Sequence, residues 1–148
     1  MKNWFRILVA VWYLLGWIPI VYLGFVNPET YRALGDTALI PGFDLIWQDF
    51  AMPRITVLAL LLAVFELAVG LLLITKGKWV KLGLVLSIGF SLFLIQLGLA
   101  IPAEDLSMDI YFNRFPNIVF VFLQLYLVFQ SYPETIYEVI RERRVSIE

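Results

Sequence analysis

Four long apolar runs dominate this sequence of 148 residues and limit what it can fold into. A bilayer core about 30 Å thick is crossed by a helix of roughly 20 apolar residues. The runs that reach or approach this length are residues 4–26, 54–75, 79–101 and 115–131. We therefore predict an all-α fold, in which one domain forms a bundle of four transmembrane helices.

Composition agrees with a membrane environment and excludes several kinds of chemistry. Hydrophobic residues make up 61% of the chain, against about 45–50% in soluble domains. The sequence has no cysteine and no histidine, so it lacks the side chains that form most zinc sites and bind haem iron. The formal net charge of −1 gives no basis for nucleic-acid binding. We expect no metal site and no cofactor held through metal ligands.

Basic residues are unevenly distributed between the two sides of the predicted bundle. Eight of the eleven fall on one side: Lys2, Arg6, Lys76, Lys78, Lys81, Arg141, Arg143 and Arg144. Cytoplasmic segments of membrane proteins carry an excess of Lys and Arg. We therefore expect a multi-pass protein of the cell membrane with both termini in the cytoplasm. Residues 133–148 are expected to form an amphipathic tail on the inner leaflet.

Residues 27–52 form the longest connection between the apolar runs. The stretch NPETYRALG has Asn27 as a cap, Pro28 in the first turn and Gly35 at its end, which predicts a short helix. The stretch DLIWQDF predicts a second short turn at the membrane interface, with Trp47 and Phe50 toward lipid. Two interpretations are open for this outer loop. It is either a simple connection or a cap over an opening between the helices.

Glu66 is an acid in the middle of the second apolar run, within the stretch AVFELAVGLLLI. Residues spaced by three and four positions share one face of a helix. On this spacing, one face carries Ala59, Ala63, Glu66 and Gly70. The opposite face carries Leu60, Val64, Leu67 and Leu71. Small residues mark close helix contacts in membranes, so we expect Glu66 to point into the bundle and the large residues to meet lipid.

Polar residues of the other runs fall at a depth comparable to that of Glu66, at a rise of about 1.5 Å per residue. The candidate ligand-binding residues are Glu66, Gln124, Tyr126, Tyr13, Ser87 and Ser91. The alternative is that these groups only hold helices together, through hydrogen bonds that contribute about 0.6–2 kcal/mol each. Ionised Glu66 would cost about 2.5–3.5 kcal/mol at mid-membrane. We therefore expect a neutral Glu66 that donates to Gln124, Tyr126, Tyr13 or a backbone carbonyl.

A second polar group is predicted at the outer ends of the helices. Its candidate members are Arg54, Asn113 and Arg114, and the acids Glu104, Asp105 and Asp109 lie nearby in the sequence. Such groups usually form a solvated rim. The alternative is a site for an anion or a lipid headgroup.

Residues 65–83, FELAVGLLLITKGKWVKLG, combine these features in one short stretch. Its pattern consists of Glu66, Gly70, Leu71, Leu72, Leu73, Lys76 and Gly77. Together with four apolar runs and a long loop after the first, this pattern resembles the DoxX-like family of small four-helix integral membrane proteins. Some members of that family are associated with quinone-linked sulfur oxidation or oxidative-stress complexes. The resemblance implies a lipid or quinone as ligand, and a membrane or peripheral protein as partner.

Three functions are compatible with the sequence. The first is an accessory or ligand-binding membrane subunit that holds a lipid or quinone-like molecule with Glu66 as buried polar anchor. The second is transport of a proton or small solute, although a relay needs several ionisable groups. The third is a purely structural assembly partner. Enzyme activity ranks last, because general acid–base catalysis needs a second group beside the acid and no spacing demands one.

Overall fold

A computed structural model describes residues 1–98 and 105–145 of the chain, with side chains as far as Arg141. Helices account for 85% of the chain, and the described residues contain no β-strand, which confirms the all-α prediction. The predicted end of the third run at residues 99–101, the candidate rim residue Glu104 and the end of the tail lie outside the described residues.

The described helices follow one another in a simple order. They are α1 (Lys2–Val26), η1 (Pro28–Tyr31), α2 (Arg32–Asp36), α3 (Phe43–Ile46), η2 (Trp47–Ala51), η3 (Met52–Arg54), α4 (Ile55–Ile74), α5 (Lys78–Leu97), α6 (Leu106–Asp109), η4 (Ile110–Arg114), α7 (Phe115–Val128) and α8 (Ile136–Val145). The short helix predicted from NPETYRALG is present as η1 and α2, but the side chain of Asn27 makes no capping hydrogen bond and α2 ends at Asp36, one residue after Gly35. The turn predicted from DLIWQDF is instead the beginning of a continuous helix that runs from Phe43 to Ile74.

Three helices of the described chain are long and apolar enough to cross a membrane: Lys2–Val26, Phe43–Ile74 and Lys78–Leu97. These three helices indicate a membrane protein. The predicted fourth run is only partly matched, because α7 has 14 residues and ends at Val128, not at residue 131. Helical residues do continue without a break from Leu106 through η4 into α7.

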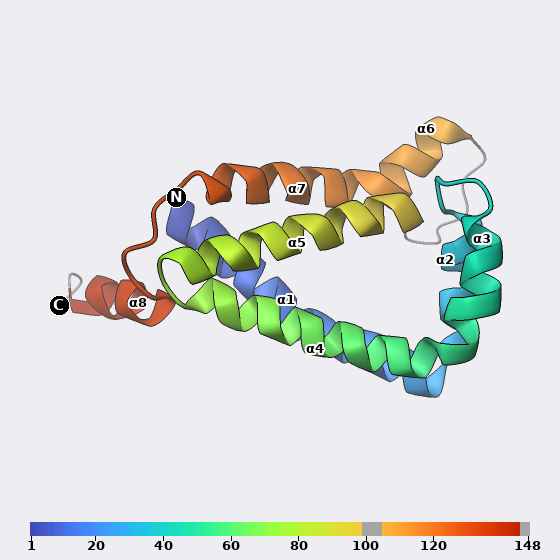
Figure 1. Cartoon of the computed structure of the whole chain (residues 1–148). Coiled ribbons are helices and arrows are strands. Elements are labelled where there is room, and N and C mark those ends of the chain that lie inside the picture. The colour runs from blue at the N-terminus through green and yellow to red at the C-terminus, as the bar shows by residue number, and fades with distance from the viewer. Residues whose placement is uncertain (99–104, 146–148) are drawn as a thin grey trace.

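The long helices pack as two pairs, α1 with α4 and α5 with α7 (Figure 1). The tight turn between α4 and α5 joins the pairs, and Gly77 in this turn has a φ of 63°, which favours glycine. Met1 and α8 lie at the same end of the molecule, here called the terminal end. The pairs separate toward the opposite end, where residues 27–54 leave the end of α1, reach the end of α5 and return to the start of α4. These residues are called the bridging segment, and their end of the molecule the bridged end.

Small residues allow α1 and α4 to approach closely along their length. A Cβ atom on Gly24 would lie 2.6 Å from the Cβ of Ala59, and one on Gly70 would lie 2.7 Å from a methyl carbon of Leu14. The predicted face of α4 is confirmed, since its members Ala59, Ala63, Glu66 and Gly70 are all buried. On the opposite face, Leu60, Val64 and Leu71 are exposed and Leu67 is half-buried. The helical periodicity of this run therefore predicts which face of α4 packs against the rest of the protein.

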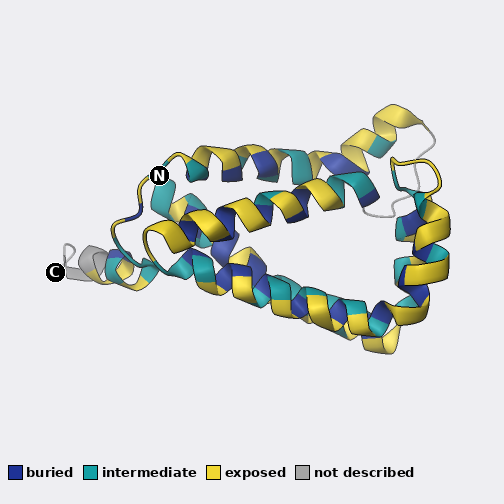
Figure 2. Cartoon of the chain, viewed as in Figure 1, coloured by how far each residue is buried: buried dark blue, intermediate teal, exposed yellow. Residues whose placement is uncertain are grey.

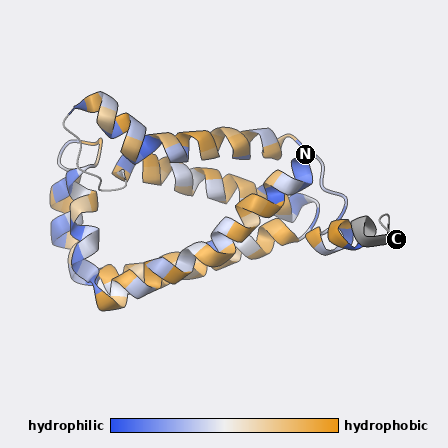
Figure 3. Ribbon diagram, turned by 180° about the vertical axis from the view of Figure 1, so that it is seen from behind, coloured by the Kyte–Doolittle hydropathy of each residue, from blue (hydrophilic) through white to orange (hydrophobic). Residues whose placement is uncertain are grey.

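Large apolar side chains cover the outward faces of the long helices. Figure 2 shows exposed residues along all four of them, and Figure 3 shows that hydrophilic residues gather near the two ends. Exposed examples from different helices are Leu8, Val64, Val85 and Phe122. A surface of this kind matches a hydrocarbon environment, because lipid tails are as apolar as the side chains that they contact.

Trp47 departs from the expected position. The sequence interpretation placed it toward lipid with Phe50, but Trp47 is only 9% exposed, whereas Phe50 is exposed as expected. The indole Nε1 of Trp47 donates a hydrogen bond to the carbonyl of Tyr31 at 2.7 Å. Its ring packs on Gly35, where a Cβ atom would lie 2.7 Å from it. Trp47 therefore holds α2 against the helix that leads into α4.

Arg6 ties three segments together at the terminal end. It is 1% exposed, and its guanidinium donates to the carbonyls of Leu73, Thr75 and Glu134. The Arg6–Leu73 bond is 2.7 Å long and the Arg6–Glu134 bond 3.0 Å. The last carbonyls of a helix have no intrahelical donor, so Arg6 satisfies groups that α4 leaves free. The ring of Tyr132 lies 5.0 Å from the guanidinium carbon.

The helix α8 begins with a reciprocal pair of hydrogen bonds. The backbone N–H of Thr135 donates to Oε2 of Glu138 at 2.7 Å, and the backbone N–H of Glu138 donates to Oγ1 of Thr135 at 3.2 Å. This arrangement is a capping box. Val139 is buried on the side of α8 that faces the protein, while Tyr137 is exposed.

Replacement of Arg6 by Met should destabilise the fold strongly. The substitution removes the donor from the buried carbonyl of Leu73 and from the partly buried carbonyls of Thr75 and Glu134, so we expect the free energy of unfolding to fall by on the order of 3 kcal/mol. The measurement is thermal unfolding of the purified protein in detergent, followed by circular dichroism. Lys81→Met, at an exposed position of α5, is the matched control and should change little. Equal effects of the two substitutions would contradict the assigned role of Arg6.

Candidate functional site

A cavity of about 1490 Å³ lies between the two helix pairs. Its walls come from α1, α4 and α5, with Pro116, Asn117 and Phe120 at the start of α7. Tyr31, Leu34 and Trp47 of the bridging segment also line it. Of the two interpretations of residues 27–52, this arrangement favours the cap over an opening between helices.

The walls of the cavity are almost entirely apolar and rich in aromatic rings. The side chains that line it include Trp12, Phe65, Phe90, Phe93 and Phe120. Phe65 and Phe90 contact each other with their ring centroids 5.6 Å apart. Among the described residues that line the cavity, Glu66 is the only one with an ionisable acid or base of the Asp, Glu, Lys or Arg type.

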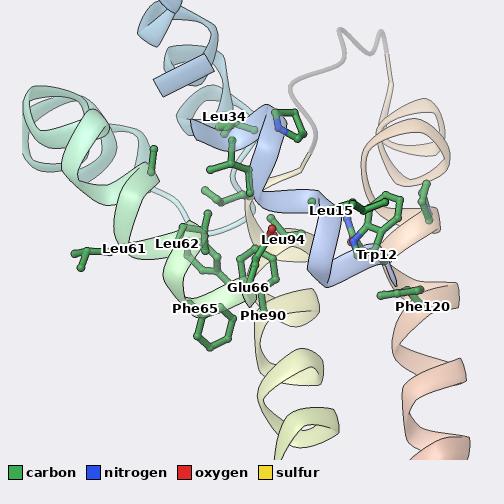
Figure 4. Close-up of a pocket in the computed structure, with 18 of the residues that line it drawn as sticks. Trp12, Leu15, Leu34, Leu61, Leu62, Phe65, Glu66, Phe90, Leu94 and Phe120 are labelled. Carbon is green, nitrogen blue, oxygen red and sulfur yellow. The ribbon is translucent and has the colours of Figure 1, made fainter. Parts of the chain in front are cut away.

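Glu66 lies at the contact between α4 and α1 and is 3% exposed. Its carboxyl group faces Gly16, where a Cβ atom would lie 2.8 Å from Oε2. Figure 4 shows the side chain among Leu62, Phe65, Phe90 and Leu94. Oε2 has no hydrogen-bond partner among the described residues. Oε2 therefore donates to none of the predicted partners, Gln124, Tyr126, Tyr13 or a backbone carbonyl, and that prediction is wrong, because the carboxyl group faces α1 across Gly16.

Four of the other predicted polar residues do come together, but in a network separate from the cavity. The hydroxyl group of Tyr13 donates to the carbonyl of Ser87 at 3.1 Å. The hydroxyl group of Ser91 and the side-chain amide of Gln124 exchange hydrogen bonds of 3.3–3.4 Å. All four residues are buried, and they come from α1, α5 and α7. They connect the helix pairs to each other, as the alternative interpretation of these residues proposed.

Tyr126 is not part of this network. It is 46% exposed, and its ring meets that of Phe5 edge to face, with the centroids 6.4 Å apart. Sequence reasoning instead missed Gly16 as the residue beside Glu66, and Tyr31 and Trp47 as walls of the cavity. A signal for the first was present, because Gly16 and Pro19 stand three positions apart in an otherwise apolar run.

The predicted outer cluster of Arg54, Asn113 and Arg114 is divided by the structure. Nε of Arg114 pairs with Oδ2 of Asp109 at 2.8 Å, and Nδ2 of Asn113 donates to Oδ1 of the same carboxylate at 2.8 Å. Arg114 also donates to the carbonyls of Ile95 and Thr37. Asn113 and Arg114 are buried, so they form a structural connection at the bridged end and not a solvated rim.

Arg54 lies apart from that connection, at the start of α4. It donates to the carbonyl of Phe50 at 3.0 Å, and its guanidinium carbon lies 4.7 Å from the centroid of the Phe50 ring. Arg54 borders a smaller surface pocket of about 390 Å³ together with Glu29 and Arg32. There the hydrogen bond and charge of Arg32 lower the pKa of Glu29. The two residues are exposed, so their ion pair is solvated.

In the ranges 1–98 and 105–145, no group of three or more acidic residues is placed to hold a metal ion. No protein-family model, curated protein or solved structure matches this chain. The resemblance to the DoxX-like family therefore stays a prediction from residues 65–83 and the pattern of apolar runs.

We predict that Glu66 is protonated in the ligand-free protein. An ionised carboxylate without a partner in apolar surroundings is strongly unfavourable. Infrared difference spectra between wild type and Glu66→Gln at neutral pH should show the C=O stretch of a protonated carboxylic acid, lost in the variant. Glu138→Gln is the control and should remove a carboxylate band, since the hydrogen bonds from Thr135 lower the pKa of Glu138. A carboxylate band lost in Glu66→Gln would refute the prediction.

Proposed function

We propose that this chain is a multi-pass membrane protein that binds an elongated apolar molecule, such as a lipid or a quinone-like compound, in the cavity between its helix pairs. Glu66 serves as the polar contact. The observation that carries the proposal is a buried carboxyl oxygen without a partner at the wall of a large apolar cavity. Ligand sites are typically apolar cavities with few polar groups, and an ionisable residue within the membrane marks a candidate site.

The proposal includes four membrane crossings and cytoplasmic termini. The fourth crossing combines α7 with η4 and α6, whose helical residues are continuous from Leu106 to Val128. An even number of crossings agrees with the location of Met1 and α8 at one end. The basic residues Lys2, Lys76 and Arg141 belong to that end, which supports its cytoplasmic orientation.

The ligand is proposed to enter from the bilayer. Several residues that line the cavity on α1 have exposed side chains, among them Trp4, Leu8, Val11 and Trp12. A molecule dissolved in the membrane therefore reaches the cavity along the apolar face of α1 without crossing the polar ends of the protein.

Ligand binding is supported better than the two other functions. A proton relay needs several ionisable groups, and Glu66 is the only acid among the described residues that line the cavity. A purely structural assembly of helices gives no reason for a large apolar cavity between the helix pairs, because contacts between helices are stabilised by close packing. An accessory role beside a membrane or peripheral enzyme, as the DoxX-like resemblance implies, is compatible with ligand binding.

Filling the cavity should displace its ligand. We expect native mass spectrometry or solvent extraction to find a lipid-soluble molecule on the protein purified in mild detergent. Leu62 lines the cavity, so Leu62→Trp should reduce the bound amount several-fold. Val64 is 65% exposed on the opposite face of α4, and Val64→Trp is the control that should retain it. Protein without bound molecules, or equal retention in both variants, would contradict the proposal.

The proposed topology predicts a specific pattern of labelling by a membrane-impermeant thiol reagent. The chain has no cysteine, so single cysteines can be introduced into the wild-type background. Lys78→Cys and Tyr137→Cys should react only from the cytoplasmic side, and Asp44→Cys and Ser107→Cys only from the outside. Labelling of Ser107→Cys and Tyr137→Cys from the same side would show that α7 does not cross the membrane.

A further inference from the structure

We infer that the ligand of this cavity is an amphiphilic amine, whose protonated nitrogen pairs with the Glu66 carboxylate while its hydrocarbon part fills the apolar space. This inference rests on the proposed function, because it assumes that the cavity binds an elongated apolar molecule. It narrows the ligand class from lipids and quinones in general to organic cations.

The carboxyl group of Glu66 is the one acid among the described residues that line the cavity. Oε2 of Glu66 is buried and unpartnered. Pro19 lies on the same wall of the cavity, and it has no N–H to offer to the carbonyl of Leu15. Two donors of the wall are already used, since the hydroxyl group of Tyr31 donates to the carbonyl of Ile20 at 2.8 Å and Nε1 of Trp47 to that of Tyr31 at 2.7 Å. Oε2 of Glu66 is therefore left to a partner that the ligand supplies.

A charged amine differs from a quinone in the form of Glu66 that it can bind. An ammonium group can pair with ionised Glu66, whereas the oxygens of a quinone only accept hydrogen bonds and can bind the protonated acid alone. No Lys or Arg lines the cavity among the described residues, so the counter-ion for an ionised Glu66 has to come from the ligand. A buried charge is strongly unfavourable alone and acceptable when paired and hydrogen-bonded.

Aromatic rings beside the carboxyl group favour the same class of ligand. Phe65 precedes Glu66 in α4, Phe90 contacts Phe65, and both rings border the cavity near the carboxyl group in Figure 4. Cations within about 6 Å of a ring centroid are attracted to its face, more strongly when water is excluded. Carboxylate and rings together therefore form a recognition site for an organic cation.

Because Gly16 has no side chain, it leaves room for the carboxyl group of Glu66. A Cβ atom there would lie 2.8 Å from Oε2 but 3.5 Å from Cδ of Glu66. Because the conflict is with the end of a flexible side chain, Gly16→Ala should displace the carboxyl group without disrupting the α1–α4 contact. Gly89 is an exposed glycine of α5 with no atom within 4 Å of an added Cβ, so Gly89→Ala is a matched control.

The test compares dodecylamine, dodecanol and decylubiquinone as ligands of the full chain in lipid nanodiscs. The amine is protonated at neutral pH, as a Lys side chain is, and the alcohol has the same hydrocarbon chain without the charge. We expect Glu66→Gln to weaken dodecylamine binding at least about tenfold, because hydrogen bonds to charged groups are the strong ones. Dodecanol binding should change less than about twofold. Gly16→Ala should also weaken amine binding, and Gly89→Ala should leave it unchanged.

Infrared spectra supply a second readout that a structural role of Glu66 would not change. Amine binding should convert the protonated-acid band of Glu66 into a carboxylate band, whereas dodecanol should leave it in place. The inference would be overturned if neither Glu66→Gln nor Gly16→Ala weakened the binding of dodecylamine. Decylubiquinone binding that depends on Glu66, without amine binding, would overturn the amine class but leave the proposed function standing. The proposed function itself fails if none of the three binds and the purified protein carries no lipid-soluble molecule.

Discussion

Two buried arginines fix the ends of this molecule, and the arrangement of its helices depends on them. Arg6 of α1 donates to carbonyls at the end of α4 and to that of Glu134. Arg114 of η4 donates to carbonyls at the end of α5 and to that of Thr37. In both cases a cation meets the C-terminal end of another helix, where free carbonyls and the helix dipole favour positive charge. Each arginine therefore fixes where one helix ends and which distant segment lies beside it.

The cavity follows from this distribution of contacts. The terminal end is held together by Arg6 and the short α4–α5 turn, so the pairs converge there. At the bridged end, Thr37 and Leu39 of the bridging segment bond to the end of α5. The segment therefore holds the pairs together across a distance that their own side chains do not fill. An apolar cavity therefore remains between the pairs, and its walls are formed by residues on the inward faces of the helices.

Local pattern and long-range contact explain what the sequence could and could not predict. The α4 face with Glu66 follows from a period of 3.6 residues, which any sufficiently long apolar helix displays. The partners of that face do not follow from it, since Gly16 is separated from Glu66 by fifty positions. From the sequence, Arg6 is one of several basic residues that indicate the orientation in the membrane. Its burial could not be predicted, because it depends on contacts with carbonyls as distant in the sequence as that of Glu134. The prediction that Trp47 faces lipid is wrong because it rested on the general preference of tryptophan for membrane interfaces. That preference cannot indicate that Gly35 leaves room for the indole ring.

The satisfied network of Tyr13, Ser87, Ser91 and Gln124 argues that Glu66 has a role other than connecting helices. Those four residues already link α1, α5 and α7 through hydrogen bonds, and Glu66 contributes none to them. The α1–α4 contact is likewise complete without an acid, because Gly24, Ala59 and Gly70 form it through small residues. A leucine or glutamine at position 66 would serve the packing without the cost of a buried acid. What an acid adds is an ionisable carboxyl group at the wall of the cavity, and that group gains a partner only when a ligand supplies one.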